Sequence, residues 1–170
     1  MIDARLQPLQ RAALRHPAQM LAARGVKADT ISIAGFAVGL LAVAALALGW
    51  WTAALVLIAA NRIMDGLDGA VARIQGPTDR GAFLDIALDF VFYALVPVGF
   101  ALHDPAANAL PAAVLIAAFV GTGSSFLAFA AIAARRGDRA AAFPTKGIYY
   151  LGGLTEGFET IVLFLAMCLI

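Results

Sequence analysis

The sequence predicts an all-α protein, a polytopic bundle of membrane-spanning helices. Its 170 residues are 62% hydrophobic and only 14% charged, and the mean hydropathy of +0.88 is well above that of an ordinary soluble domain. Long apolar runs recur between short turns, and about 20 apolar residues are enough to cross the hydrocarbon of a bilayer. We therefore expect a single membrane domain over residues 1–170, with membrane lipids around it and no nucleic acid among its partners.

The first 27 residues are expected to lie on the membrane surface. Apolar residues and arginines alternate here at roughly helical spacing, with interruptions at Pro8 and Pro17. This pattern predicts an interfacial amphipathic helix whose apolar side enters the lipid and whose arginines face anionic head groups. The alternative is a flexible basic tail.

Five membrane spans are predicted after this segment. They cover residues 31–49, 51–73, 82–102, 109–134 and 147–170. Turn-forming residues separate the runs, and Pro111 is a suitable first residue for the fourth helix because proline is tolerated in a first turn. The single cysteine, Cys168, excludes an internal disulfide framework and a zinc-binding cysteine pattern.

The basic residues predict how the bundle is oriented. They belong to the N-terminal segment, to the inner end of the second span and the turn that follows it, and to the connection between the fourth and fifth spans, whereas the turns near Trp50 and His103 contain no Lys or Arg. Positive charge accumulates on the cytoplasmic side of membrane proteins. The N-terminus is therefore expected in the cytoplasm.

Four aspartates are concentrated at the inner ends of the second and third spans. Asp65 and Asp68 are three residues apart, and Asp85 and Asp89 are four apart, so each pair lies on one face of its helix. Two helices joined by a short turn would bring all four carboxylates together. Oxygen ligands without His or Cys suit Mg²⁺ or Mn²⁺ rather than zinc, and two such ions can act together in a displacement at phosphorus.

The residues after Asp68 favour a phosphorylated substrate. Gly69 removes a side chain beside the carboxylates, Ala72 keeps the next turn narrow, and Arg73 can bind a phosphate with its fork of donors. Together with the aspartates they indicate a pyrophosphate-bearing substrate that enters from the cytoplasm.

This stretch resembles the signature of the CDP-alcohol phosphatidyltransferase family, which is D-x2-D-G-x2-A-R, a short gap, and G-x3-D-x3-D. All eight fixed positions match, at Asp65, Asp68, Gly69, Ala72, Arg73, Gly81, Asp85 and Asp89. The segment from Ala28 to Ile31 is similar to the family's P-N-x-x-T entry to the first span, with Ala28 in place of the common proline.

The resemblance implies transfer of a phosphatidyl group from a CDP-alcohol lipid, usually CDP-diacylglycerol, to a small polar alcohol, with release of CMP. It implies that the first metal ion is bound by Asp65, Asp68 and Asp85. Asp89 would help to bind the second ion and act as the general base. The resemblance further implies a CDP-lipid site formed by Asp29, Thr30, Gly69, Ala72, Arg73, Thr78 and Gly81. It also implies a homodimer. We expect the protein in the inner (cytoplasmic) membrane of a bacterium, with the active site facing the cytoplasm because the aspartates fall on the side that carries the basic residues.

The acceptor alcohol stays open. Glycerol-phosphate and inositol-phosphate members of the family commonly have Lys or Arg after the last aspartate, whereas Phe90 follows Asp89 here, which disfavours a phosphorylated acceptor. Arg62 or a basic group after the fourth span could instead supply an anion site, although that group is also explained as a topological charge cluster. The group consists of Arg135, Arg136, Arg139 and Lys146. Family members usually have six spans, against the five predicted here.

Two other functions fit parts of the pattern. Intramembrane carboxylates also line the pathways of cation channels and proton-coupled transporters, but there they are expected along the depth of the bilayer rather than at one end. A catalytically inactive relative is the other alternative, although loss of activity usually breaks the motif, and the motif is intact.

Overall fold

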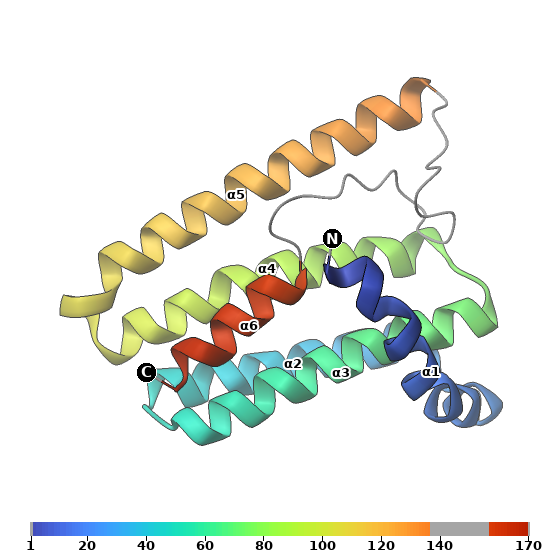
Figure 1. The fold of residues 1–170 in the computed structure, drawn as a ribbon, viewed down its shortest axis with the longest axis horizontal. Coiled ribbons are helices and arrows are strands. Elements are labelled where there is room, and N and C mark those ends of the chain that lie inside the picture. The colour runs from blue at the N-terminus through green and yellow to red at the C-terminus, as the bar shows by residue number, and fades with distance from the viewer. Residues whose placement is uncertain (1, 137–156, 170) are drawn as a thin grey trace.

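A computed structural model describes residues 2–136 and 157–169, and these residues form α-helices joined by short turns (Figure 1). The helices are α1 (Ile2–Ala23), α2 (Ala28–Ala47), α3 (Trp51–Gln75), α4 (Asp79–His103), α5 (Pro105–Arg136) and α6 (Gly157–Met167). The described part of the chain contains no strand. The prediction of an all-α bundle is confirmed.

Three of the described helices are long and apolar enough to cross a membrane, namely α2, α4 and α5. Helix α3 covers the predicted second span and is as long as α4, at 25 residues each, but charged residues in its second half keep it out of this group. The predicted fifth span, 147–170, is described only from residue 157, where α6 contributes 11 apolar residues. Helix α1 runs without a break through Pro8 and Pro17, and its position at a membrane surface stays a prediction.

The prediction that Pro111 starts the fourth helix is wrong. Helix α5 begins at Pro105 and includes Pro111 in its second turn, whereas the sequence pattern places Pro111 at the helix start. Proline tolerates a helical first turn, so both Pro105 and Pro111 are possible starts. Asp104 selects the earlier one, because its carboxylate accepts a hydrogen bond from the Ala107 amide at 3.1 Å.

Helices α2, α3 and α4 form the centre of the bundle. Helix α2 packs against both α3 and α4, α5 packs on α4, α1 crosses the end of α3, and α6 contacts α3 and α1. The pairing of α2 with its neighbours is close because Gly35 and Gly39 lie one turn apart on its packed face, where a Cβ atom on Gly39 would lie 2.8 Å from the Phe92 ring. Small residues at this spacing let helix backbones approach in a membrane.

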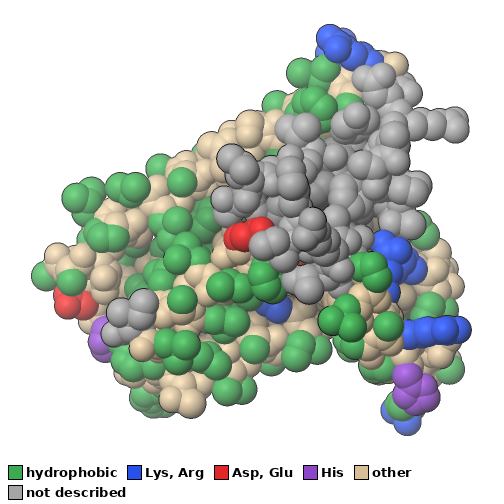
Figure 2. Space-filling view, in the orientation of Figure 1, with side chains coloured by type: hydrophobic (Ala, Val, Ile, Leu, Met, Phe, Trp, Pro, Cys, Tyr) green, Lys and Arg blue, Asp and Glu red, His purple; other side chains and the backbone are tan. Residues whose placement is uncertain are grey.

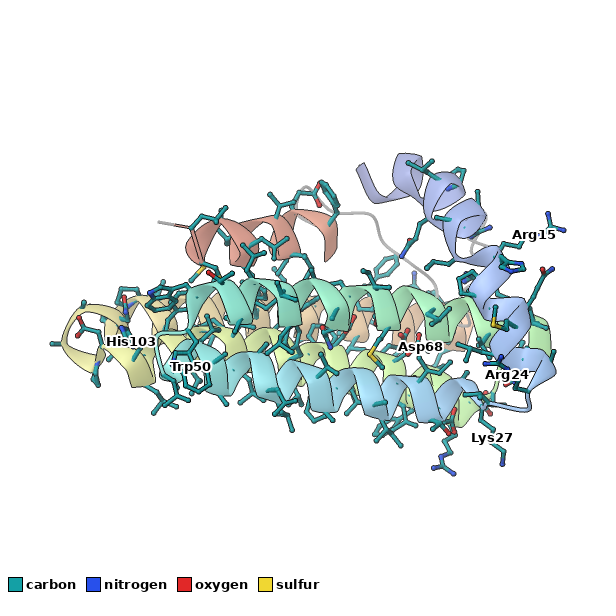
Figure 3. All side chains as sticks on the ribbon, turned by 90° about the horizontal axis from the view of Figure 1, so that it is seen from below. Arg15, Arg24, Lys27, Trp50, Asp68 and His103 are labelled. Atoms are coloured by element: carbon teal, nitrogen blue, oxygen red, sulfur yellow. The ribbon has the colours of Figure 1, made fainter. Side chains whose placement is uncertain are left out.

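The bundle has two chemically different ends. Figure 3 shows Arg15, Arg24 and Lys27 at the end nearer Asp68, and Trp50 and His103 at the opposite end. Figure 2 shows hydrophobic side chains over most of the visible described surface, with Lys and Arg gathered toward the end that carries α1 and the end of α5. The charge distribution along the sequence is therefore also a distribution in space.

Candidate metal and substrate site

Three of the four aspartates meet between α3 and α4. Asp65, Asp68 and Asp85 each offer a carboxylate oxygen, and these oxygens lie within 4.8 Å of one another. Asp68 is buried and Asp85 is exposed, so the group extends from the interior to the surface of the bundle. Three carboxylates at this separation are a donor set that fits a hard divalent cation, and their mutual repulsion favours one.

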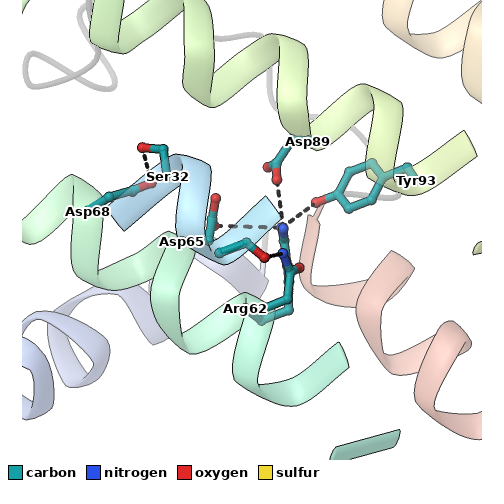
Figure 4. Close-up of polar contacts among 8 residues, drawn as sticks. Ser32, Arg62, Asp65, Asp68, Asp89 and Tyr93 are labelled. Atoms are coloured by element: carbon teal, nitrogen blue, oxygen red, sulfur yellow. Dashed lines mark hydrogen bonds and ion pairs between the residues drawn. The ribbon is translucent and has the colours of Figure 1, made fainter. Parts of the chain in front are cut away.

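The buried member of this group has a hydrogen-bond partner on α2. The Ser32 hydroxyl donates to Asp68 Oδ2 at 2.5 Å (Figure 4), and Asp68 is only 4% exposed. The Ser32 contact fixes one carboxylate oxygen of Asp68 and connects the site to a third helix. Ligand carboxylates are commonly oriented by such hydrogen bonds.

The fourth aspartate has a different partner. Asp89 Oδ1 accepts a hydrogen bond from Arg62 Nη2 at 2.7 Å, and Arg62 Nη1 lies 3.6 Å from Asp65 Oδ2. Because α3 and α4 are antiparallel, one turn forward on α4 from Asp85 corresponds to one turn back on α3. The side chain opposite Asp89 is therefore Arg62 rather than another aspartate.

All four aspartates nevertheless line one pocket. Its other lining residues come from α2, α3 and α4, and they are Ser32, Gly35, Phe36, Asn61, Arg62 and Leu88. Asn61 is buried, and its side-chain amide donates to the Gly35 carbonyl at 2.9 Å. This contact fixes α2 against α3 at the bottom of the carboxylate group.

Three residues predicted for the CDP-lipid site come together at the start of α4. Thr78 caps this helix, since its hydroxyl accepts from the Gly81 amide at 3.0 Å. A Cβ atom on Gly81 would lie 3.1 Å from Thr78 Oγ1 and 3.3 Å from Asp29 Oδ1, so the absence of a side chain leaves room at this point. Asp29 also pairs with Arg80 at 3.3 Å. Asp29, Thr78 and Gly81 are thus neighbours, one helical turn from Asp85.

The remaining predicted CDP-lipid residues lie on α3 and at the start of α2. Gly69 faces Arg73, because a Cβ atom on Gly69 would lie 3.5 Å from Arg73 Nη1. Arg73 is exposed, Ala72 is half-buried, and Thr30 is exposed in the first turn of α2. Gly69 and Arg73 therefore follow directly from the carboxylate group along the same helix.

Of the basic residues considered for an acceptor anion site, Arg62 lines this pocket, whereas the described part of the group after the fourth span does not. Arg135 and Arg136 are exposed in the last turn of α5 and are not among the lining residues. Arg139 and Lys146 lie outside the described residues. Position 90, where a cation is common in the family, holds Phe90, whose ring lies where a Cβ atom on Gly123 of α5 would be.

Sequence reasoning missed Ser32 and Asn61, which line the pocket, and Tyr93, whose hydroxyl accepts a hydrogen bond from Arg62 Nη1 at 3.3 Å. Each is a polar side chain inside an apolar helix, and such residues usually have a specific partner within a membrane bundle. That signal was present in the sequence. The partners themselves come from other helices and depend on how these helices are rotated.

Comparisons with known proteins found a matching family model and a similar bacterial membrane protein. The sequence model described as CDP-alcohol phosphatidyltransferase matches residues 26–170. The chain is also similar to "Inner membrane protein YnjF" of Escherichia coli (strain K12), with 53% identity over 169 residues that cover 99% of this chain and 82% of YnjF. No solved structure matches the chain.

Proposed function

The chain belongs to the CDP-alcohol phosphatidyltransferase family, and from this premise we propose that it transfers the phosphatidyl group of CDP-diacylglycerol to the hydroxyl of a small polar alcohol. Membership supports phosphatidyl transfer in general. The observation that carries the proposal is the meeting of Asp65, Asp68 and Asp85 within 4.8 Å in a pocket that Asp89 also lines. The donor and the acceptor class come from the resemblance of the motif.

In the proposed reaction one bond forms and one bond breaks at a single phosphorus. The acceptor oxygen bonds to the phosphorus that carries diacylglycerol, and the bond from this phosphorus to the bridging oxygen breaks. CMP leaves with the bridging oxygen. The Asp89 carboxylate takes the proton of the acceptor hydroxyl, a role worth about 10²- to 10⁴-fold for a positioned general base.

The carboxylates of Asp65, Asp68 and Asp85 would hold a divalent ion, Mg²⁺ or Mn²⁺, and Asp89 would contribute to a second. When bound, such ions supply neutralisation of the pyrophosphate charge and stabilisation of the leaving CMP. We propose that the nucleotide lies toward the start of α4, where Asp29, Thr78 and Gly81 are neighbours, and that Thr30, the residue after Asp29, also contacts it. Gly69, Ala72 and Arg73 would contact the CDP moiety from α3. Arg73 is exposed and its guanidinium lies beside Gly69, so both could contact the same group of the substrate.

We further propose that the protein lies in the inner membrane of a bacterium with this site facing the cytoplasm. The similar E. coli protein is an inner membrane protein by its name, and α2, α4 and α5 are long and apolar enough to span. Arg15, Arg24 and Lys27 lie at the end of the bundle nearer Asp68 (Figure 3), which supports the orientation. The diacyl chains of the donor would stay in the lipid while the acceptor arrives from water. A homodimer stays a prediction.

The test is release of CMP from CDP-diacylglycerol by the full chain in lipid nanodiscs with Mg²⁺ or Mn²⁺. Serine, glycerol 3-phosphate, inositol phosphate and choline are compared as acceptors. We expect hydroxyl-dependent release that falls about 10²- to 10⁴-fold in Asp89→Asn. The matched control is Asp104→Asn, at the opposite end of the bundle, where asparagine can still cap α5.

A transporter would give a different result. Ion flux in proteoliposomes, with no CMP release from CDP-diacylglycerol under any acceptor, would contradict the proposed reaction. Equal release by Asp89→Asn and wild type would leave the transfer in place and remove Asp89 as the base.

A further inference from the structure

Arg62 is a partly buried cation outside the family signature. It lies in the middle of α3, one turn before Asp65, and its side chain is only 16% exposed. A charge at this depth in a membrane bundle is costly unless it is paired, and intramembrane charges are usually functional. The contacts of Arg62 therefore indicate what role it has.

The guanidinium of Arg62 is directed at the fourth aspartate by several hydrogen bonds (Figure 4). Its Nη2 donates to Asp89 Oδ1 at 2.7 Å, its Nη1 to the Tyr93 hydroxyl at 3.3 Å, and its Nε to Asn61 Oδ1 at 2.8 Å. The planar fork of donors makes this set directional. Rotation of the guanidinium away from Asp89 would break more than one of these bonds.

Aromatic rings hold the same guanidinium from the side. Arg62 Cζ lies 5.1 Å from the centroid of the Phe92 ring and 5.5 Å from that of Tyr93, distances at which a cation is attracted to a ring face. The Phe164 ring of α6 lies 6.5 Å from Phe92 and 6.0 Å from Tyr93. The two rings that contact Arg62 are therefore themselves held in place by packing against α6, without any substrate.

These contacts connect Arg62 to the helix that carries Asp89. Phe92 and Tyr93 lie three and four residues after Asp89 on α4, so the guanidinium contacts the carboxylate and the rings of the next turn together. We propose that Arg62 is a positioning residue, whose guanidinium holds the Asp89 carboxylate at the angle needed to take a proton from the acceptor alcohol. This inference rests on the proposed function.

The kinetic test compares three variants of the full chain in nanodiscs. Arg62→Gln should lower kcat at least tenfold while the KM values for CDP-diacylglycerol and for the best acceptor stay within about threefold, as for loss of an outer partner of a site carboxylate. Arg62→Lys should recover part of the loss, because it keeps the charge without the fork. Arg15→Gln, an exposed site on α1, controls for removal of one positive charge and should match wild type.

A stability test does not depend on the reaction. Thermal unfolding is measured for Arg62→Gln, Asp89→Asn and the double variant. Each single substitution removes the same partly buried contact between Arg62 and Asp89, so the second substitution should shift Tm by less than half of its effect in the wild-type background. Strictly additive shifts would overturn the pairing, whether or not the wild type releases CMP.

The outcomes separate the two proposals. Coupled Tm shifts without CMP release by the wild type would remove the proposed function and with it the catalytic role of Arg62. An active wild type with unchanged kcat in Arg62→Gln would overturn the positioning role alone. A rise of more than tenfold in the acceptor KM with kcat unchanged would also overturn it, since Arg62 would then bind substrate directly.

Discussion

The two halves of α3 have opposite compositions, although they belong to one continuous helix. The first half packs through Ala54 and Ile58, which are fully buried, and its Trp51 ring stacks on Phe100 at 5.7 Å. The second half also buries polar groups, Asn61 at 3% and Asp68 at 4% exposure, beside the apolar Ala70 and Val71. We call these the apolar half and the polar half of the bundle, together with the side chains that pack on each.

The contrast shows how one helix can carry both stability and chemistry. In the apolar half, close packing fixes α3 against α2 and α4, because dispersion contacts add up only when surfaces fit. In the polar half, four carboxylates and one guanidinium share a pocket, and like charges there oppose packing. The apolar half therefore holds the helices at the separation that the carboxylates require. Substitutions in the two halves should accordingly affect different measurements.

The largest effect on activity is expected from Asp68→Asn. Asparagine keeps the shape of the side chain and can still accept a hydrogen bond from Ser32, but it removes a charge from the group with Asp65 and Asp85. CMP release should fall at least about 100-fold, since a metal ion supplies several kcal/mol of charge stabilisation. The midpoint of thermal unfolding in metal-free buffer should stay the same or rise, because repulsion between carboxylates decreases.

The contrast between the halves would fail if Asp68→Asn unfolded the protein. It would also fail if the variant kept wild-type activity, because the buried carboxylate would then be structural. Asp79→Asn is a suitable control, since Asp79 is an exposed acid in the first turn of α4 and lies outside the pocket lining.

Gly99→Ala in the apolar half is expected to lower stability and to leave activity unchanged. A Cβ atom on Gly99 would lie 2.9 Å from Leu46 Cβ and 3.1 Å from the Val43 carbonyl oxygen, so α4 and α2 would have to separate. Such overpacking costs about 1–3 kcal/mol of unfolding free energy. Activity per folded molecule should stay close to wild type, measured as CMP release normalised to the monodisperse fraction.

The matched control is Gly121→Ala on α5, where a Cβ atom would meet nothing within 4 Å. It should be neutral or more stable by about 0.5–1 kcal/mol, as expected for Gly to Ala in a helix. If Gly99→Ala reduced kcat of the folded protein as strongly as Asp68→Asn, the two halves would not be independent.

The sequence predicts the polar half better than it predicts the contacts within it. Spacing alone places Asp65 with Asp68, and Asp85 with Asp89, because positions three or four apart share a helix face. The structure then separates the second pair, since Asp85 joins the α3 carboxylates and Asp89 pairs with Arg62. This division depends on the register between two antiparallel helices, and a periodic pattern within one helix does not contain that register.

Helix boundaries, too, depend on contacts that a periodic pattern does not contain. Hydropathy locates the apolar runs, because transfer into lipid depends on composition over a whole window. The first residue of α5 depends instead on one carboxylate, Asp104, and its hydrogen bond to Ala107. The choice between Pro105 and Pro111 as the first residue is therefore made by a single local contact. Hydropathy averaged over about 20 residues does not detect such a contact.

The smallest effect is expected where a polar contact of α3 lies outside the pocket. At the end of this helix Gln75 Nε2 donates to the Val26 carbonyl at 2.7 Å, and the Ala28 amide donates to Gln75 Oε1 at 3.4 Å. Gln75 thus holds the turn between α1 and α2 at the position where the family commonly has proline instead of Ala28. Gln75→Ala should cost about 1 kcal/mol, the net worth of a typical hydrogen bond.

Ala28→Pro tests whether a proline at position 28 stabilises this turn as well as the Gln75 hydrogen bonds do. Ala28 is the first residue of α2, where proline is tolerated. Lys27 before it is extended, with φ −79° and ψ 145°, which is the conformation that a residue before proline prefers. It removes only the longer hydrogen bond, and its fixed φ restricts the unfolded chain, so unfolding free energy should stay the same or rise by up to about 1 kcal/mol. In the Gln75→Ala background, proline should restore most of the lost stability. A clear loss of stability in Ala28→Pro alone would mean that the amide of residue 28 is needed as a donor, and that Gln75 does more than proline does elsewhere in the family.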